Sequence, residues 1–198
     1  MVKKIFLGVA FALFAGLQAQ EIATDRISIP GPLEYDGTEY YLFWSKQVSK
    51  TLYRQQYLPA DERPEDFTQI LDLSYFTKEI DIELAVRQKV ESIQNRQEKD
   101  KFAKVNVTES PDGKEFIVDY YISETPSKGE PFVEYNIFRF KPMEQTGQKK
   151  FLILSYAKRI YGDLKSAAKT LSKERDRLIT SMIEYKVPDI KVAETPGK

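Results

Sequence analysis

The pattern of apolar and polar positions changes its period several times along the chain. Alternating or aromatic-rich extended segments predict β-strands at residues 38–47, 51–58, 67–76, 102–109 and 115–123, with a short helical start at residues 64–70 as the alternative for the third. The turn sequence Ser110-Pro111-Asp112-Gly113-Lys114 separates the last two and predicts a hairpin, because proline favours the second position of a turn and glycine accepts a positive φ. The short segment 27–32, which contains proline and glycine, is interpreted as an entry segment or an edge strand.

Two later strands differ from these. Segments 132–141 and 150–159 carry apolar residues on both faces, which is typical of strands at the centre of a sheet with layers packed above and below. Lys158 and Arg159, at the end of the second segment, are interpreted as solubilising charges.

A helical period occurs twice. Ile82, Val86, Val90 and Ile93 form one apolar stripe and predict a helix at about residues 78–97. A second helix is predicted to begin after an N-cap at Asp163 and to end before Pro188. Its stripe comprises Leu164, Ala168, Leu171, Arg175, Leu178 and Met182.

The order of elements is strands, helix, four strands, helix. It predicts a single α+β domain over residues 20–190, with an antiparallel sheet of about six or seven strands covered by two helices in an α-β-α sandwich-like arrangement. Residues 191–198 are expected to form a flexible tail.

The amino terminus has the pattern of a secretory signal peptide. Lys3 and Lys4 precede an apolar run from Ile5 to Leu17, and the small residue Ala19 follows. The run is too short to span a bilayer, which takes roughly 20 residues. We therefore expect residues 1–19 to be removed and the mature chain to work in the periplasm or outside the cell, without a membrane span.

Composition excludes several chemistries. The chain contains no cysteine and no histidine, so it has no Ser-His-Asp triad, no cysteine nucleophile and no ordinary zinc or copper site. Thirty basic and thirty acidic residues balance, so no basic excess supports nucleic-acid binding. Twelve tyrosines, twelve phenylalanines and one tryptophan favour a packed globular domain over a disordered secreted chain.

The candidate ligand-binding residues are Tyr40, Trp44, Tyr135 and Arg139. Tyr40 and Trp44 belong to a cluster of strand aromatics that could stack on a sugar or a peptide, with core packing as the alternative. No catalytic residue, metal ligand or cofactor is assigned. The acidic loop with Asp61, Glu62, Glu65 and Asp66 lacks the alternating pattern and central glycine of a calcium loop and is interpreted as solvated.

The segment YLPADERPEDFTQIL, from Tyr57 to Leu71, resembles a group of uncharacterised secreted proteins of Gram-negative bacteria. A Tyr-Asn-aromatic-Arg strand (residues 135–139) followed by a long carboxy-terminal helix resembles the same group, although Phe67 stands where tryptophan is often expected. The element order is similar to the PsbP/Mog1-type sandwich, which implies a binding role. The resemblance implies no activity and transfers no site residues.

We expect a non-enzymatic secreted or periplasmic binding domain, whose partner is an unknown small ligand or an envelope protein. One alternative is a carboxylate-dependent hydrolase or lyase. Glu134, Asp119 and Arg139 could supply an acid, a base and an anion clamp, although these residues are interpreted first as structural or surface charges. Another is a structural envelope protein that docks through a sheet edge or its last helix.

Overall fold

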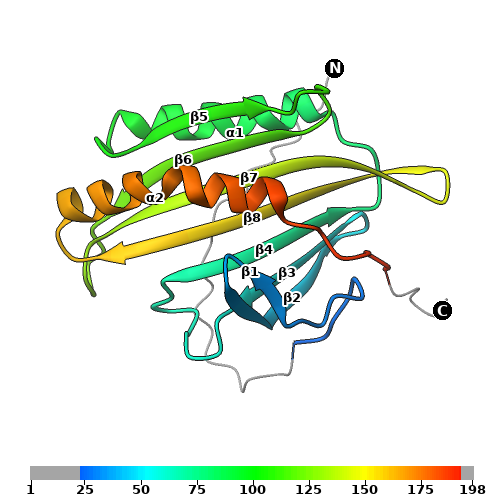
Figure 1. Ribbon diagram of the computed structural model, residues 1–198, viewed down its shortest axis with the longest axis horizontal. Helices are drawn as coiled ribbons and strands as arrows, with labels where there is room; N and C mark the ends of the chain where they lie inside the picture. The colour runs from blue at the N-terminus through cyan, green and yellow to red at the C-terminus, as the bar shows by residue number, and fades with distance from the viewer. Residues whose placement is uncertain (1–22, 193–198) are drawn as a thin grey trace.

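The computed structural model describes residues 23–192, so the predicted signal peptide and residues 193–198 of the predicted tail lie outside the described residues. Within this range the chain forms eight strands and two helices (Figure 1). In chain order these are β1 (Leu33–Tyr35), β2 (Thr38–Ser49), β3 (Leu52–Leu58), β4 (Gln69–Phe76), α1 (Ile82–Gln97), β5 (Lys104–Glu109), β6 (Phe116–Glu124), β7 (Phe132–Gln145), β8 (Gln148–Tyr161) and α2 (Leu164–Glu184).

The strands form one antiparallel sheet in the order β1-β2-β3-β4-β8-β7-β6-β5. Each half is a meander of neighbouring hairpins, and α1 is the connection between the two halves. The halves join where β4 pairs with β8, with Leu73 opposite Leu154.

The sheet curls into a half-barrel. Tyr35 of β1 and Tyr156 of β8 are four strands apart in the sheet order, which in a flat sheet would separate them by about 19 Å at about 4.8 Å per strand. Their ring centroids are instead 4.9 Å apart, and the Tyr35 hydroxyl donates a hydrogen bond to the Leu178 carbonyl of α2. The β1 end of the sheet has therefore folded over toward α2.

The predicted sheet of six or seven strands covered by two helices is wrong: the structure is a curled half-barrel of eight antiparallel strands with two helices. The strand count failed because β1 has only three residues, too few to show a period. The available signal was the Asp36-Gly37 pair, both at positive φ, a two-residue turn that favours a hairpin. Curling could not be inferred, because a two-residue period is the same in flat and curled sheets.

The two helices pack on opposite faces of the sheet. On β7, Val133, Tyr135 and Ile137 join the core cluster that contains the buried residues of α2, whereas Phe138 joins the cluster that contains those of α1. The prediction that β7 and β8 carry apolar residues on both faces is thus explained by a core on each side.

Local signals gave correct elements. The hairpin of β5 and β6 pairs Lys104 with Tyr121 and closes through Ser110 to Lys114. Asp163 caps α2, since its carboxylate accepts a hydrogen bond from the backbone N–H of Ser166. Within residues 23–192 neither helix combines the length and the apolar character needed to cross a bilayer.

Candidate functional site

A groove lies between α1 and the part of the sheet that this helix does not cover. α1 packs mainly on β5, β6 and β7, so the same face of β3, β4 and β8 remains open beside it. The resulting cavity, which we call the α1 groove, has a volume of about 600 Å³. It is lined by Arg54, Asp72, Ser74, Ala85, Gln88, Lys89, Ser92, Ile93, Arg96, Tyr120, Ile122, Glu124, Pro126, Phe132, Glu134, Phe138, Phe140, Ile153, Ser155 and Arg159.

Aromatic rings form much of the apolar wall. Tyr120 and Phe138 stack with ring centroids 5.6 Å apart, and the ring centroids of Phe138 and Phe140 are 6.5 Å apart. These side chains come from neighbouring strands β6 and β7, where Val118 lies opposite Phe138 and places the rings on the α1 face. A flat apolar ligand could pack against this surface.

A buried ion pair closes one end of the groove. Arg159 Nε lies 2.5 Å from Glu134 Oε2, and the two side chains are 7% and 3% exposed. The other Glu134 oxygen accepts a hydrogen bond from Asn136 at 2.9 Å. The Arg159 guanidinium is sandwiched between Phe67 and Phe132, 3.8 and 4.4 Å from their ring centroids. Arg159 is therefore a buried structural charge, and its interpretation as a solubilising residue is wrong.

A second pair lies across the groove on β3 and β4. Arg54 Nη2 is 2.5 Å from Asp72 Oδ2, which also accepts a hydrogen bond from Gln56 at 2.9 Å. The other Asp72 oxygen accepts one from Ser74 at 3.0 Å. Asp72 is thus held by three donors.

The groove holds two further cations, both on α1: Arg96, which pairs with Asp100 and Glu124, and Lys89. The half-buried side chain of Lys89 places Nζ 4.0 Å from the Phe138 ring centroid and 5.6 Å from that of Tyr120. Among residues 23–192 it forms no ion pair with a carboxylate, unlike Arg54 and Arg159. Desolvation, and secondly the charge of Arg54, lowers the pKa of Lys89 to about 8.

The four residues predicted to bind a ligand are not brought together. Tyr40 and Tyr135 are fully buried on the α2 side, where their hydroxyls donate to Gln69 and Asp119. A bulge in β2 between Leu42 and Trp44 interrupts the alternation and sets Trp44 opposite Gln56, on the α1 side. The Arg54 guanidinium lies 5.9 Å from the Trp44 ring centroid, so Trp44 lies beside the groove where Arg54 pairs with Asp72.

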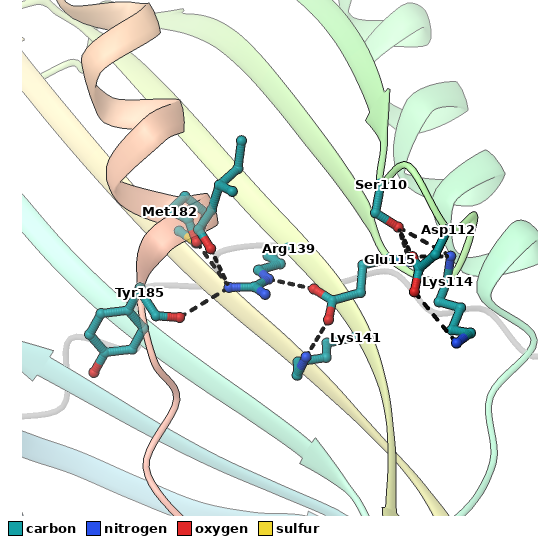
Figure 2. Close-up of polar contacts among 9 residues, drawn as sticks. Ser110, Asp112, Lys114, Glu115, Arg139, Lys141, Met182 and Tyr185 are labelled. Atoms are coloured by element: carbon teal, nitrogen blue, oxygen red, sulfur yellow. Dashed lines mark hydrogen bonds and ion pairs between the residues drawn. The ribbon is translucent and has the colours of Figure 1, made fainter.

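Arg139, the fourth, is placed at the carboxy-terminal end of α2 (Figure 2). Its Nη1 donates to the carbonyls of Met182 and Tyr185, each at 3.1 Å, while its Nε donates to Glu115 at 2.6 Å. Figure 2 also shows Lys141 on the second Glu115 oxygen. Arg139 thus satisfies the last carbonyls of the helix, which no N–H of the helix can reach. Ligand binding by these four residues stays a prediction.

The proposed acid and base do not share a site either. Glu134 lines the α1 groove, whereas Asp119 lies on the other face, where Arg175 of α2 holds both of its oxygens at 2.8 Å. The sheet separates the two carboxylates.

In the acidic loop, Glu62 accepts hydrogen bonds from the backbone N–H groups of Thr68 and Gln69, so it orders the turn into β4.

Sequence reasoning missed Arg54, Asp72 and Lys89. For Asp72 a signal existed, since a charged residue inside the mostly apolar run Ile70 to Phe76 must find a partner when it is buried. Lys89 carries no such signal, because a lysine next to an apolar stripe is ordinary on a helix surface.

Comparisons with known proteins add a family. A protein-family model matches residues 27–187, which is most of the chain, so the chain belongs to that family, which is uncharacterised. No curated protein and no solved structure matches the chain. Membership of an uncharacterised family is thus confirmed, whereas the relationship to the PsbP/Mog1-type sandwich is not.

Proposed function

We propose that this member of an uncharacterised family is a non-enzymatic binding domain that holds a small molecule in the α1 groove. The observation that carries the proposal is a cavity of about 600 Å³ in which apolar aromatic walls meet a few buried charges. Binding sites for small molecules are typically concave, about 300–1,000 Å³ in volume, mostly apolar, and supplied with a small number of placed polar groups.

The condition of the groove carboxylates supports binding over catalysis. Glu134 is held by Arg159 and Asn136, and Asp72 by Arg54, Gln56 and Ser74. A general acid or base needs an oxygen that can exchange a proton with a substrate. Both of these carboxylates already use their oxygens for contacts within the protein, and Glu124, the third carboxylate of the groove, is paired with Arg96. A hydrolase or lyase mechanism therefore finds no comparable support.

The cellular location is part of the same proposal. The lysine pair, apolar run and small residue of positions 1–19 support export, and the absence of thiols is compatible with an oxidising compartment. A secreted or periplasmic domain of this kind would meet its small ligand, or an envelope protein carrying it, outside the cytoplasm.

The test closes the groove at its rim. Ser92 is exposed and lines the groove from α1, so Ser92→Trp sets a bulky ring over the opening with little effect on the core. Gln94→Trp is the matched control, because Gln94 is exposed on the same helix and does not line the groove. We expect the uncharged fluorophore phenylnaphthylamine to bind the unmodified protein and Gln94→Trp with equal affinity and Ser92→Trp several-fold more weakly.

Circular dichroism and urea midpoints verify that both variants fold. Equal binding to all three proteins would place the apolar site elsewhere, and absence of binding to the unmodified protein would reject the groove as an apolar binding site.

A further inference from the structure

The cations of the α1 groove differ in how their charge is compensated. Arg54 and Arg159 each form a short ion pair, with Asp72 and Glu134 respectively. Lys89 forms no ion pair within the described part of the chain: its ammonium lies 4.0 Å from the Phe138 ring centroid, and the charges of Arg54 and Asp72 are near enough to shift its pKa in opposite directions. Arg96, which also lines the groove, pairs with Asp100 and Glu124, so Lys89 is the groove cation without a carboxylate in ion-pair contact among residues 23–192.

The surroundings of Lys89 favour an anion over a neutral partner. Its pKa is lowered to about 8 by burial, so in neutral solution it is still charged but poorly solvated. A negatively charged ligand atom would give it a charge-assisted hydrogen bond in a place where water is partly excluded, and such bonds are about twice as strong as neutral ones. Arg54 lines the groove as well, and its buried Nε has no acceptor among residues 23–192.

The balance of charge limits the ligand to a single negative charge. The carboxylates of Asp72, Glu124 and Glu134 line the same cavity, and each is already paired with an arginine. A dianion such as a phosphate monoester would bring one negative charge more than Lys89 can neutralise, close to these carboxylates. A carboxylate brings one.

We infer that the ligand of the α1 groove is a small monocarboxylate with an apolar body, and that Lys89 binds its carboxylate while Tyr120, Phe138 and Phe140 pack against the apolar part. This inference rests on the proposed function, because it names the class of molecule that the same groove takes. Lys89 contacts the ligand directly.

The experiment uses two fluorophores that differ by one charge. Anilinonaphthalene sulfonate is phenylnaphthylamine with one sulfonate. The two probes therefore share an apolar body and differ by a single negative charge. Lys89→Met removes the charge and keeps the chain length, Lys89→Arg keeps the charge, and Arg87→Met removes a charge from an exposed position of α1 outside the groove. Urea midpoints establish that each variant is folded.

We expect Lys89→Met to weaken the sulfonate probe by about tenfold or more, as for the loss of one charge-assisted contact. It should not weaken the binding of phenylnaphthylamine, which has no charge for Lys89 to neutralise, and Lys89→Arg should retain most of the sulfonate affinity. Octanoate should displace the sulfonate probe from the unmodified protein at lower concentrations than octanol or octyl phosphate do.

Two outcomes would overturn the inference. If Lys89→Met and Arg87→Met affect the sulfonate probe equally, Lys89 does not bind the anion, and the groove is a neutral apolar site as long as Ser92→Trp still blocks phenylnaphthylamine. If octyl phosphate displaces the probe better than octanoate, the ligand is a phosphate ester. Failure of the proposed function itself would appear separately, as loss of phenylnaphthylamine binding to the unmodified protein.

Discussion

Replacing Lys89 by methionine should make the protein more stable while it weakens anion binding. The reason is that the folded protein holds a charged ammonium in a poorly solvated groove with no carboxylate partner among the described residues. Methionine has nearly the same length, no charge, and a sulfur that packs well on aromatic rings such as Phe138. The change therefore removes a cost of folding and keeps the contacts.

The magnitude follows from the pKa of Lys89. A value lowered from 10.5 to about 8 means that folding disfavours the charged form by about 3 kcal/mol. The cation–π contacts with Phe138 and Tyr120 offset about 0.5–2 kcal/mol of this desolvation cost. Methionine replaces them with sulfur–aromatic contacts worth about 0.3–1.5 kcal/mol. We expect Lys89→Met to raise the free energy of unfolding by about 1–3 kcal/mol near neutral pH.

The pH dependence has a definite sign. The folded-state pKa is lower than the unfolded-state value, so between about pH 8 and 10.5 the unfolded chain holds a proton that the folded protein has released. In that window the contribution of Lys89 to stability rises with pH. The advantage of the methionine variant should therefore be largest below pH 8 and shrink toward pH 10.

Urea denaturation of both proteins, followed by circular dichroism at neutral pH and near pH 10, measures this effect. Arg87→Met is the control, since Arg87 is exposed and its loss should change stability by no more than about 0.5 kcal/mol. A Lys89→Met protein that is less stable than the unmodified one, or a stability difference that is the same at both pH values, would refute the reasoning.

Three further results are expected. Affinity for anilinonaphthalene sulfonate, measured by its fluorescence, should fall as the pH rises above about 8, because Lys89 loses its charge. An affinity that does not change with pH would show that another group binds the anion. Arg175→Met should lower the free energy of unfolding by about 3–5 kcal/mol in urea denaturation, since it leaves the fully buried Asp119 carboxylate without its cation, and adding Asp119→Asn should recover part of the loss. Leu171→Ala, at a fully buried position of α2, should lower the free energy of unfolding by about 2–5 kcal/mol, and Leu84→Ala, at a position of α1 that is 48% exposed, by much less. Similar urea midpoints for the two variants would mean that α2 does not pack as described.

The pH experiment concerns a cation with several charged neighbours. Arg54 of β3, Asp72 of β4, Glu134 of β7 and Arg159 of β8 line the same groove and form two ion pairs, and a third joins Arg96 of α1 to Glu124 of β6. Tyr120 of β6 also faces the groove, and burial raises its pKa well above the usual value, so it stays neutral in the range of the assay. Lys89 is therefore the group that titrates near pH 8.

The sequence alone determined the features that depend on near neighbours in the chain. The Pro-Asp-Gly turn predicts the β5–β6 hairpin because only a few residues define its geometry. Asp163 predicts the start of α2 since its side chain bonds to the helix it precedes. The two-sided apolar pattern of β7 and β8 correctly indicated central strands with a packed layer on each face.

Tertiary structure decided the curl, the bulge and the site. The curl depends on Tyr35 meeting Tyr156 across the sheet, and the bulge at β2 moves Trp44 to the face opposite Tyr40, which no alternating pattern reveals. The groove joins Arg54, Lys89 and Arg159 from three elements distant in sequence. Lys89 is left without an ion pair because the fold supplies carboxylates to Arg54, Arg96 and Arg159 and aromatic rings to Lys89.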